Sequence, residues 1–151
     1  MGQAHAAAAF GLHQPYDPEK RVWIVDDNMQ ASYIFTHDRK QLLQTIGTPE
    51  HGVAVDLINR HVFVDDRNNH RIQVFDENGT YRSEWAIDAE PSSLHLLYIG
   101  QDRNVWTFDR STNKMVQYDQ EGHLKYAWGT MGNFPGGLWG VHGMSVDQEG
   151  N

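Results

Sequence analysis

The sequence repeats itself at intervals of about 40 residues, and this period constrains the fold more than any other feature of the chain. Shifted by 40 residues, Val-Trp-Ile at 22–24 falls on Val-Phe-Val at 62–64. Shifted by a further 43 residues, Asp-Arg at 66–67 falls on Asp-Arg at 109–110. A period of this length, made of short strand-like runs, is typical of the blades of a β-propeller.

The middle copy contains four segments that predict strands. The segments 52–56 (GVAVD) and 62–64 (VFV) are apolar runs rich in β-branched and aromatic residues. The segments 72–74 (IQV) and 81–85 (YRSEW) alternate between apolar and polar residues, as half-buried strands do. Short turns rich in Asp and Asn separate these segments. The sequence therefore predicts an all-β fold whose blades each contain four antiparallel strands.

The number of blades decides how a ring can close. The predicted blades cover about 21–47, 51–87 and 93–130, a closing strand covers 141–147, and residues 1–20 form an N-terminal tail whose alanine run is the only segment with a helix as an alternative. Propellers contain about four to eight blades, and this chain supplies about three. We therefore expect either a homodimer that completes a six-bladed ring or a fragment of a longer chain. A closed ring also removes sheet edges that otherwise pair promiscuously.

Composition and charge exclude several classes of partner and site. The formal net charge of −8 disfavours binding to the phosphates of nucleic acids. The chain has no cysteine, which excludes disulfides and thiolate metal sites. No apolar run reaches the length of a membrane span, and the N-terminus lacks the pattern of a signal peptide. We expect neither nucleic acid nor membrane as a partner, and the sequence does not indicate a compartment.

A column of the repeat that is filled in every copy indicates scaffold. Asp26, Asp66 and Asp109 fill such a column and are predicted to accept backbone N–H bonds in the turn that follows. Asn69 and Arg71 fit the same turn.

Aromatic residues and glycines mark the ends of the predicted blades. Trp85 and Trp128 occupy equivalent positions at the ends of strands and are predicted to pack between blades. The following segment, 129–143, contains six glycines together with Phe134 and Trp139. It predicts a long loop that serves either as a crossover between blades or as a wall at the mouth of the central channel.

Two histidines precede inner strands. His51 and His142 each stand directly before Gly, an apolar residue, a small residue, Val and Asp. Because inner strands line the channel of a propeller, both imidazoles are predicted to face its axis, where they can hold zinc or another divalent cation. The third copy has Leu94-His95 at this place, one position out of register. The alternative is that each histidine caps a strand end or lies in solvent.

The four-strand unit from GVAVD through VFVDDRNNHRIQVFDENG resembles the NHL repeat, and the resemblance extends over about residues 21–151. The stretch from His51 to Trp85 is also similar to one blade of the catalytic domain of the peptidylglycine α-amidating lyases. That resemblance implies an axial zinc held by histidines of alternate blades and cleavage of a peptidyl-α-hydroxyglycine to an amide and glyoxylate. It also implies that His51 and His142 are zinc ligands and that Arg67 binds substrate. Relatives of this type are often secreted.

The sequence departs from the lyase pattern at several positions. Gly52 and Gly143 follow the two histidines, where the family has Asp after one ligand, and the third histidine and a tyrosine turn have no match. Arg110 fills the same column as Arg67, so a solvent-exposed turn arginine is the alternative for Arg67. Three functions stay open: a binding or scaffold propeller with an axial site for a metal, peptide or small ligand; a zinc-dependent lyase; and a platform for a protein partner.

Overall fold

The chain folds into three four-stranded antiparallel sheets. The computed structural model describes residues 4–9 (backbone only), 21–26, 29, 31–47, 52–87 and 93–144. The first sheet contains β1 (Ala4–Ala9), β2 (Arg21–Asp26), β3 (Ala31–Thr36) and β4 (Leu42–Ile46). The second contains β5 (Gly52–Asp56), β6 (His61–Asp66), β7 (Arg71–Asp76) and β8 (Tyr81–Ala86), with the 3-10 helix η1 (Arg67–Asn69) between β6 and β7. The third contains β9 (Leu94–Ile99), β10 (Val105–Asp109), β11 (Lys114–Tyr118) and β12 (Leu124–Trp128).

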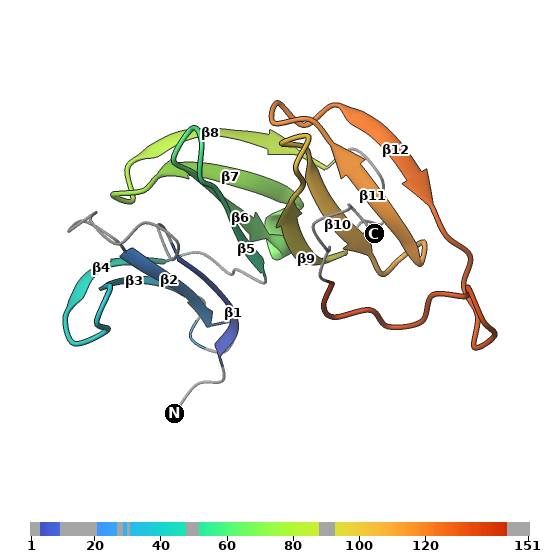
Figure 1. Ribbon diagram of the computed structural model, residues 1–151, viewed down its shortest axis with the longest axis horizontal. Coiled ribbons are helices and arrows are strands. Elements are labelled where there is room, and N and C mark those ends of the chain that lie inside the picture. The colour runs from blue at the N-terminus through green and yellow to red at the C-terminus, as the bar shows by residue number, and fades with distance from the viewer. Residues whose placement is uncertain are drawn as a thin grey trace.

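The sheets are arranged as consecutive blades of a propeller. In each sheet neighbouring strands are consecutive in the chain. The inner strands β1, β5 and β9 lie together near the centre of Figure 1, and β5 contacts both of the others. The outer strands β4, β8 and β12 lie on the periphery. The predicted all-β fold with four-stranded antiparallel blades is thereby confirmed. Among the described residues, no helix is long and apolar enough to cross a membrane.

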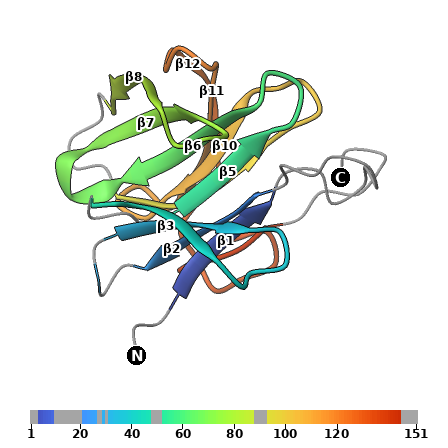
Figure 2. The same cartoon turned by 90° about the vertical axis from the view of Figure 1, so that its left-hand side faces the viewer.

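The second blade is buried on both faces, which explains its continuous apolar runs. Val62, Val64 and Phe75 pack in a core with residues of the first blade, which lies face to face with the second in Figure 2. Phe63 and Trp85 project from the opposite face into a core shared with the third blade. Because successive side chains of a strand point to opposite faces, a strand between two blades needs apolar residues at every position.

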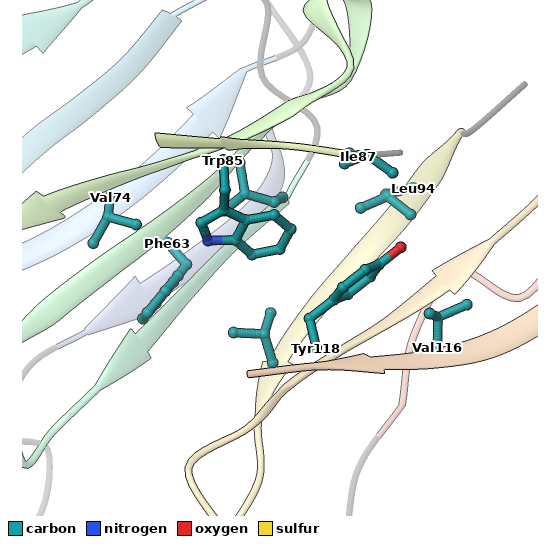
Figure 3. Packing of buried hydrophobic residues seen from close by; sticks show 9 residues of the cluster. Phe63, Val74, Trp85, Ile87, Leu94, Val116 and Tyr118 are labelled. Atoms are coloured by element: carbon teal, nitrogen blue, oxygen red, sulfur yellow. The ribbon is translucent and has the colours of Figure 1, made fainter. Parts of the chain in front are cut away.

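Figure 3 shows how the second and third blades interlock. The ring of Trp85 stands beside the ring of Tyr118, with 5.2 Å between ring centroids. Trp85 is 9% exposed, so its predicted position between blades is confirmed. Trp128 occupies the equivalent position in the third blade but is 45% exposed.

Two members of the aspartate column accept backbone hydrogen bonds, as predicted. The backbone N–H of Ser111 donates to Asp109 Oδ1 at 2.9 Å. The backbone N–H of Met29 donates to Asp26 Oδ1 at 3.2 Å. These bonds tie the turn to the end of the preceding strand in the first and third blades.

Asp66 is satisfied differently. Its carboxylate receives the side-chain amide of Asn69 at 2.9 Å and the Nε–H of Arg71 at 2.7 Å. The turn after Asp66 is the 3-10 helix η1, which closes on its own backbone bond from His70 N–H to Arg67 O at 3.1 Å. The prediction that Asp66 accepts backbone N–H bonds was therefore wrong. Its donors are the side chains of Asn69 and Arg71, which η1 brings to the carboxylate.

The N-terminal alanine run forms a strand. We predicted a tail here, yet Ala4–Ala9 pair with β2 in antiparallel register. Alanine is depleted in strands, so its low propensity conceals a strand that is fixed by backbone pairing with β2. The position beside β2, which a closing strand from the C-terminus would occupy, is held by β1.

The start of the predicted closing strand has no regular structure. Residues 141–144 form no strand, and residues 145–147 lie outside the described residues. Val141 and Met144 instead pack with Leu138 against the buried Phe108 and Met115 of the third blade. The loop after β12 thus folds back over part of that blade.

Candidate functional site

Three segments bring a cation and two imidazoles together where the second and third blades meet. Arg67 is the first residue of η1, His95 is the second residue of β9, and His142 lies in the loop after β12. The guanidinium Nη1 of Arg67 lies 3.4 Å from Nε2 of His95. The rings of His95 and His142 meet edge to face, with centroids 5.0 Å apart and planes 87° apart. We refer to Arg67, His95 and His142 as the arginine–histidine cluster.

Hydrogen bonding determines which ring nitrogens carry protons in the cluster. His142 Nδ1 lies 2.5 Å from the carbonyl oxygen of Gly140. Because a carbonyl only accepts, Nδ1 of His142 is the donor, and Nε2 is the acceptor nitrogen of the neutral ring. A guanidinium only donates, so Nε2 of His95 accepts in its contact with Arg67.

The members of the cluster differ in exposure. His95 is 7% exposed, Arg67 is half-buried and His142 is exposed. The buried imidazole of His95 is therefore held in place by its surroundings, whereas Arg67 and His142 remain accessible to a ligand. A cation in such a partly buried position interacts more strongly with an anion than a cation in bulk water does.

The structure places two of the three predicted site residues in one cluster. Arg67 and His142 are joined through His95, although they are far apart in the sequence. His51 lies outside the described residues, so its predicted role as a metal ligand stays a prediction.

His95 links these two residues, and the repeat does not single it out because it is one position out of register. The structure gives the reason: the pairing of β9 with β10 is irregular, with Thr107 opposite Leu97 but Asp109 opposite Leu94. A β-bulge of this kind inserts one residue and redirects the side chains beside it. A one-residue slip beside a histidine in an inner strand is thus a signal that sequence reasoning can use.

The cluster fits a metal ion only in part. Among the residues that the structure describes, no three His, Cys, Asp or Glu side chains gather as a metal-binding group would. His142 has the arrangement expected of a ligand, since metal-binding histidines commonly donate their other ring N–H to a backbone carbonyl. Nε2 of His95 faces the Arg67 guanidinium, and a cation there would be repelled.

A second arginine joins the same two blades at the opposite ends of the inner strands. Nη2 of Arg103, in the turn after β9, donates to Asp56 Oδ2 at 2.9 Å. The side-chain amide of Gln120 donates to the same oxygen at 2.7 Å. Burial alone would raise the pKa of Asp56, but the hydrogen bonds from Gln120 and Arg103 outweigh it and lower that pKa. The Asp56 carboxylate is buried and accepts from both donors, whereas the Arg103 side chain is partly exposed.

Comparisons with known proteins concern the fold. The NHL repeat model matches residues 51–75, so the chain contains an NHL repeat in its second blade. The sequence has no significant match among curated proteins. Streptogramin B lyase is 18% identical, with a TM-score of 0.63 over 89% of this chain and 50% of that chain.

Two further solved structures extend the likeness. A catalytically inactive histidine-to-alanine variant of virginiamycin B lyase from Staphylococcus aureus with quinupristin is 16% identical, with a TM-score of 0.61 over 71% of this chain and 37% of that chain. Hydrazine synthase of Kuenenia stuttgartiensis is 9% identical, with a TM-score of 0.64 over 82% of this chain and 35% of that chain. The chain thus spans half or less of each of these structures. Together they show that it has the all-β, NHL-type fold of part of a larger β-propeller.

Proposed function

We propose that the chain is part of an NHL-type propeller that binds a small carboxylate-bearing ligand at the arginine–histidine cluster. The observation that carries this proposal is the convergence of Arg67, His95 and His142 from three separate segments. Scaffold alone does not require a guanidinium and two imidazoles at one point. These groups suit a ligand carboxylate, because an arginine binds it through paired hydrogen bonds and a histidine can move a proton beside it.

Each member has a distinct role in this proposal. Arg67 supplies the guanidinium that binds the carboxylate. His95 positions Arg67 through the contact at its Nε2. His142 offers Nε2 as a proton acceptor, because its Nδ1–H is committed to Gly140.

The reaction class that this arrangement supports is a lyase, in which a histidine takes a proton from a bound substrate. Two of the solved structures that share the fold are lyases by name, and one of those is inactive as a histidine variant. An enzyme of this class needs a positioned cation for the substrate and a neutral imidazole within reach of it. Arg67 and His142 supply these groups here.

Zinc or another divalent cation is a second candidate at the same site. The hydrogen bond from His142 to Gly140 orients that ring as a ligand, and His51 is the proposed partner ligand. A bound zinc ion would polarise a substrate oxygen, while Arg67 holds the substrate carboxylate.

Calorimetric titration with N-acetylglycine tests carboxylate binding. Arg67→Ala should weaken binding at least about tenfold, because a charged hydrogen-bonded pair is lost. Arg110→Ala is the matched control, since Arg110 fills the same repeat column but is exposed in its turn. Equal affinity of wild type and Arg67→Ala would overturn the proposal.

Two assays test the chemistry. Glyoxylate release from an α-hydroxyglycine peptide and ring opening of quinupristin are measured with and without added zinc, and His142→Ala should abolish whichever activity is present. Metal analysis of untagged protein tests the second candidate. Zinc content that stays the same in His51→Ala and His142→Ala would exclude the metal site while leaving carboxylate binding intact.

A further inference from the structure

Each blade carries a forward face, which packs on the following blade. In the second blade this face includes Phe63 and Trp85, which are 0% and 9% exposed against the third blade. In the third blade the repeat-equivalent residues are Trp106, which is half-buried, and Trp128, which is 45% exposed. The same position is thus covered in one blade and exposed in the next.

The exposed part of the third blade's forward face is its outer strand. Tyr126 and Trp128 of β12 lie opposite Gln117 and Met115 and are 56% and 45% exposed. The inner part of this face is covered by the loop after β12, whose Leu138 and Val141 pack against the blade. Neighbouring exposed apolar side chains on one strand indicate an interaction surface.

The backward face shows the complementary pattern at the other end of the chain. In the second blade Val62 and Phe75 are 0% and 4% exposed against the first blade. In the third blade Val105 and Tyr118 are 0% and 6% exposed against the second.

In the first blade the repeat-equivalent residues are only half-buried. These are Val22 and Phe35, with Ile24 and Tyr33 on the same face. The first blade therefore leaves partly exposed the kind of face that the third blade needs as its partner.

We propose that the occupant of both faces is a second copy of this chain, bound head to tail. The third blade of each copy packs on the first blade of the other, as the second blade packs on the first within one copy. Two such contacts related by a two-fold axis close a ring of six blades.

The ring has a consequence for the arginine–histidine cluster. Because β5 and β9 are inner strands, closure places two clusters on one channel, related by the two-fold axis. The pairing itself follows from the two apolar faces alone and does not depend on what the cluster binds.

Light scattering on protein eluting from a sizing column tests the assembly. The expected mass at micromolar concentration is twice the 17.3 kDa of the chain. A mass of one chain over the whole concentration range would overturn the proposal.

Two variants test each face. Trp128→Glu alters the forward face and Phe35→Glu the backward face, and each should reduce the mass to that of one chain. Tyr126→Glu replaces Trp128→Glu if circular dichroism shows that the latter does not fold. Ile58→Glu is the control, because Ile58 is 72% exposed in the turn after β5 and away from both faces.

Mixing the variants distinguishes two kinds of contact. In one, a forward face pairs with a backward face, and in the other, two forward faces pair with each other. A Trp128→Glu copy retains an intact backward face, and a Phe35→Glu copy retains an intact forward face. The mixture can form one of the two contacts, so a fraction of the double mass should return. If Phe35→Glu alone keeps the double mass while Trp128→Glu loses it, forward faces pair with each other and the head-to-tail proposal is wrong.

Discussion

The second and third blades are joined by two arginines, one at each end of their inner strands, and the two differ in what they contact. Arg103 reaches back from the third blade to the carboxylate of Asp56. Arg67 reaches forward from the second blade to the imidazole of His95. The first arginine meets a buried anion that also accepts from Gln120. The second meets a buried imidazole beside an exposed histidine.

This difference separates a structural end from a candidate functional end of the same blade contact. An arginine paired with a buried carboxylate is fixed in place, and removing either member leaves the other without its partner. An arginine beside an imidazole keeps its positive charge, because that contact involves no anion. Loss of Asp56 or Arg103 should therefore act mainly on stability, and loss of Arg67 mainly on binding.

The largest effect is expected from Asp56→Ala. This change removes the acceptor of Arg103 and Gln120 in a site where Asp56 is 2% exposed. It should lower the free energy of unfolding by about 3 kcal/mol, measured by urea denaturation at pH 7. Asp38→Ala is the control, because Asp38 also accepts from its own turn but is exposed, and it should cost much less than Asp56→Ala. Equal losses would show that the Asp56 network does not join the blades.

The next largest loss of stability is expected from Gly122→Ala, in the turn that also carries Gln120. A Cβ on Gly122 would lie 2.5 Å from Cδ2 of Trp85, and Gly122 has a φ of +89°. Gly122→Ala should therefore cost about 2 kcal/mol more than Gly136→Ala, because the indole must move.

Gly136 is a matched control because its φ is +88° but no heavy atom lies within 4 Å of its added Cβ. The difference between the two variants isolates the contact between blades from the backbone cost. Thermal unfolding measures the stability of both variants. Equal losses would mean that the turn does not pack tightly against Trp85.

Acid should lower the free energy of unfolding, because it protonates Asp56 and weakens its contacts with Arg103 and Gln120. Since that pKa is lower in the folded chain, the unfolded chain binds more protons as pH falls below about 3.9, and the contribution of Asp56 is lost there. Above about pH 5 its contribution is complete. Asp56→Asn should therefore lose less stability than wild type between pH 5 and the acid transition, when both are compared by urea denaturation. Parallel pH curves would contradict this, because the lowered pKa values of Asp76 and Asp119 are common to both proteins.

Sequence patterns predicted the blades well because the residues of their packed strands have high strand propensity. The VFV run of β6 is buried on both faces, so its β-branched and aromatic residues reflect the environment directly. The alanines of β1 lack that signal, since backbone pairing with β2 holds them as a strand. Local propensity therefore finds the strands that pack and misses the strand that is only paired.

The arginine–histidine cluster was only partly predictable for a related reason. The repeat singles out Arg67 and His142 by position, but their meeting point is His95, which a bulge in β9 displaces from the register. The loop after β12 then returns His142 to that point by packing on the third blade. Strand propensity predicts neither the bulge nor the path of a glycine-rich loop. The cluster could therefore be recognised only in the three-dimensional structure.

The smallest stability effect is expected at the functional end. Arg67→Ala should change the free energy of unfolding by less than about 1 kcal/mol, because Arg67 is half-buried and its 3.4 Å contact with His95 is long for a hydrogen bond. Arg103→Ala is the comparison, and it should cost about 2 kcal/mol by leaving the Asp56 carboxylate buried without its cation. Urea denaturation of both variants at pH 7 decides between the two assignments. If Arg67→Ala proved as destabilising as Arg103→Ala, both arginines would be fastenings between blades, and weakened carboxylate binding in Arg67→Ala would then reflect a loosened structure.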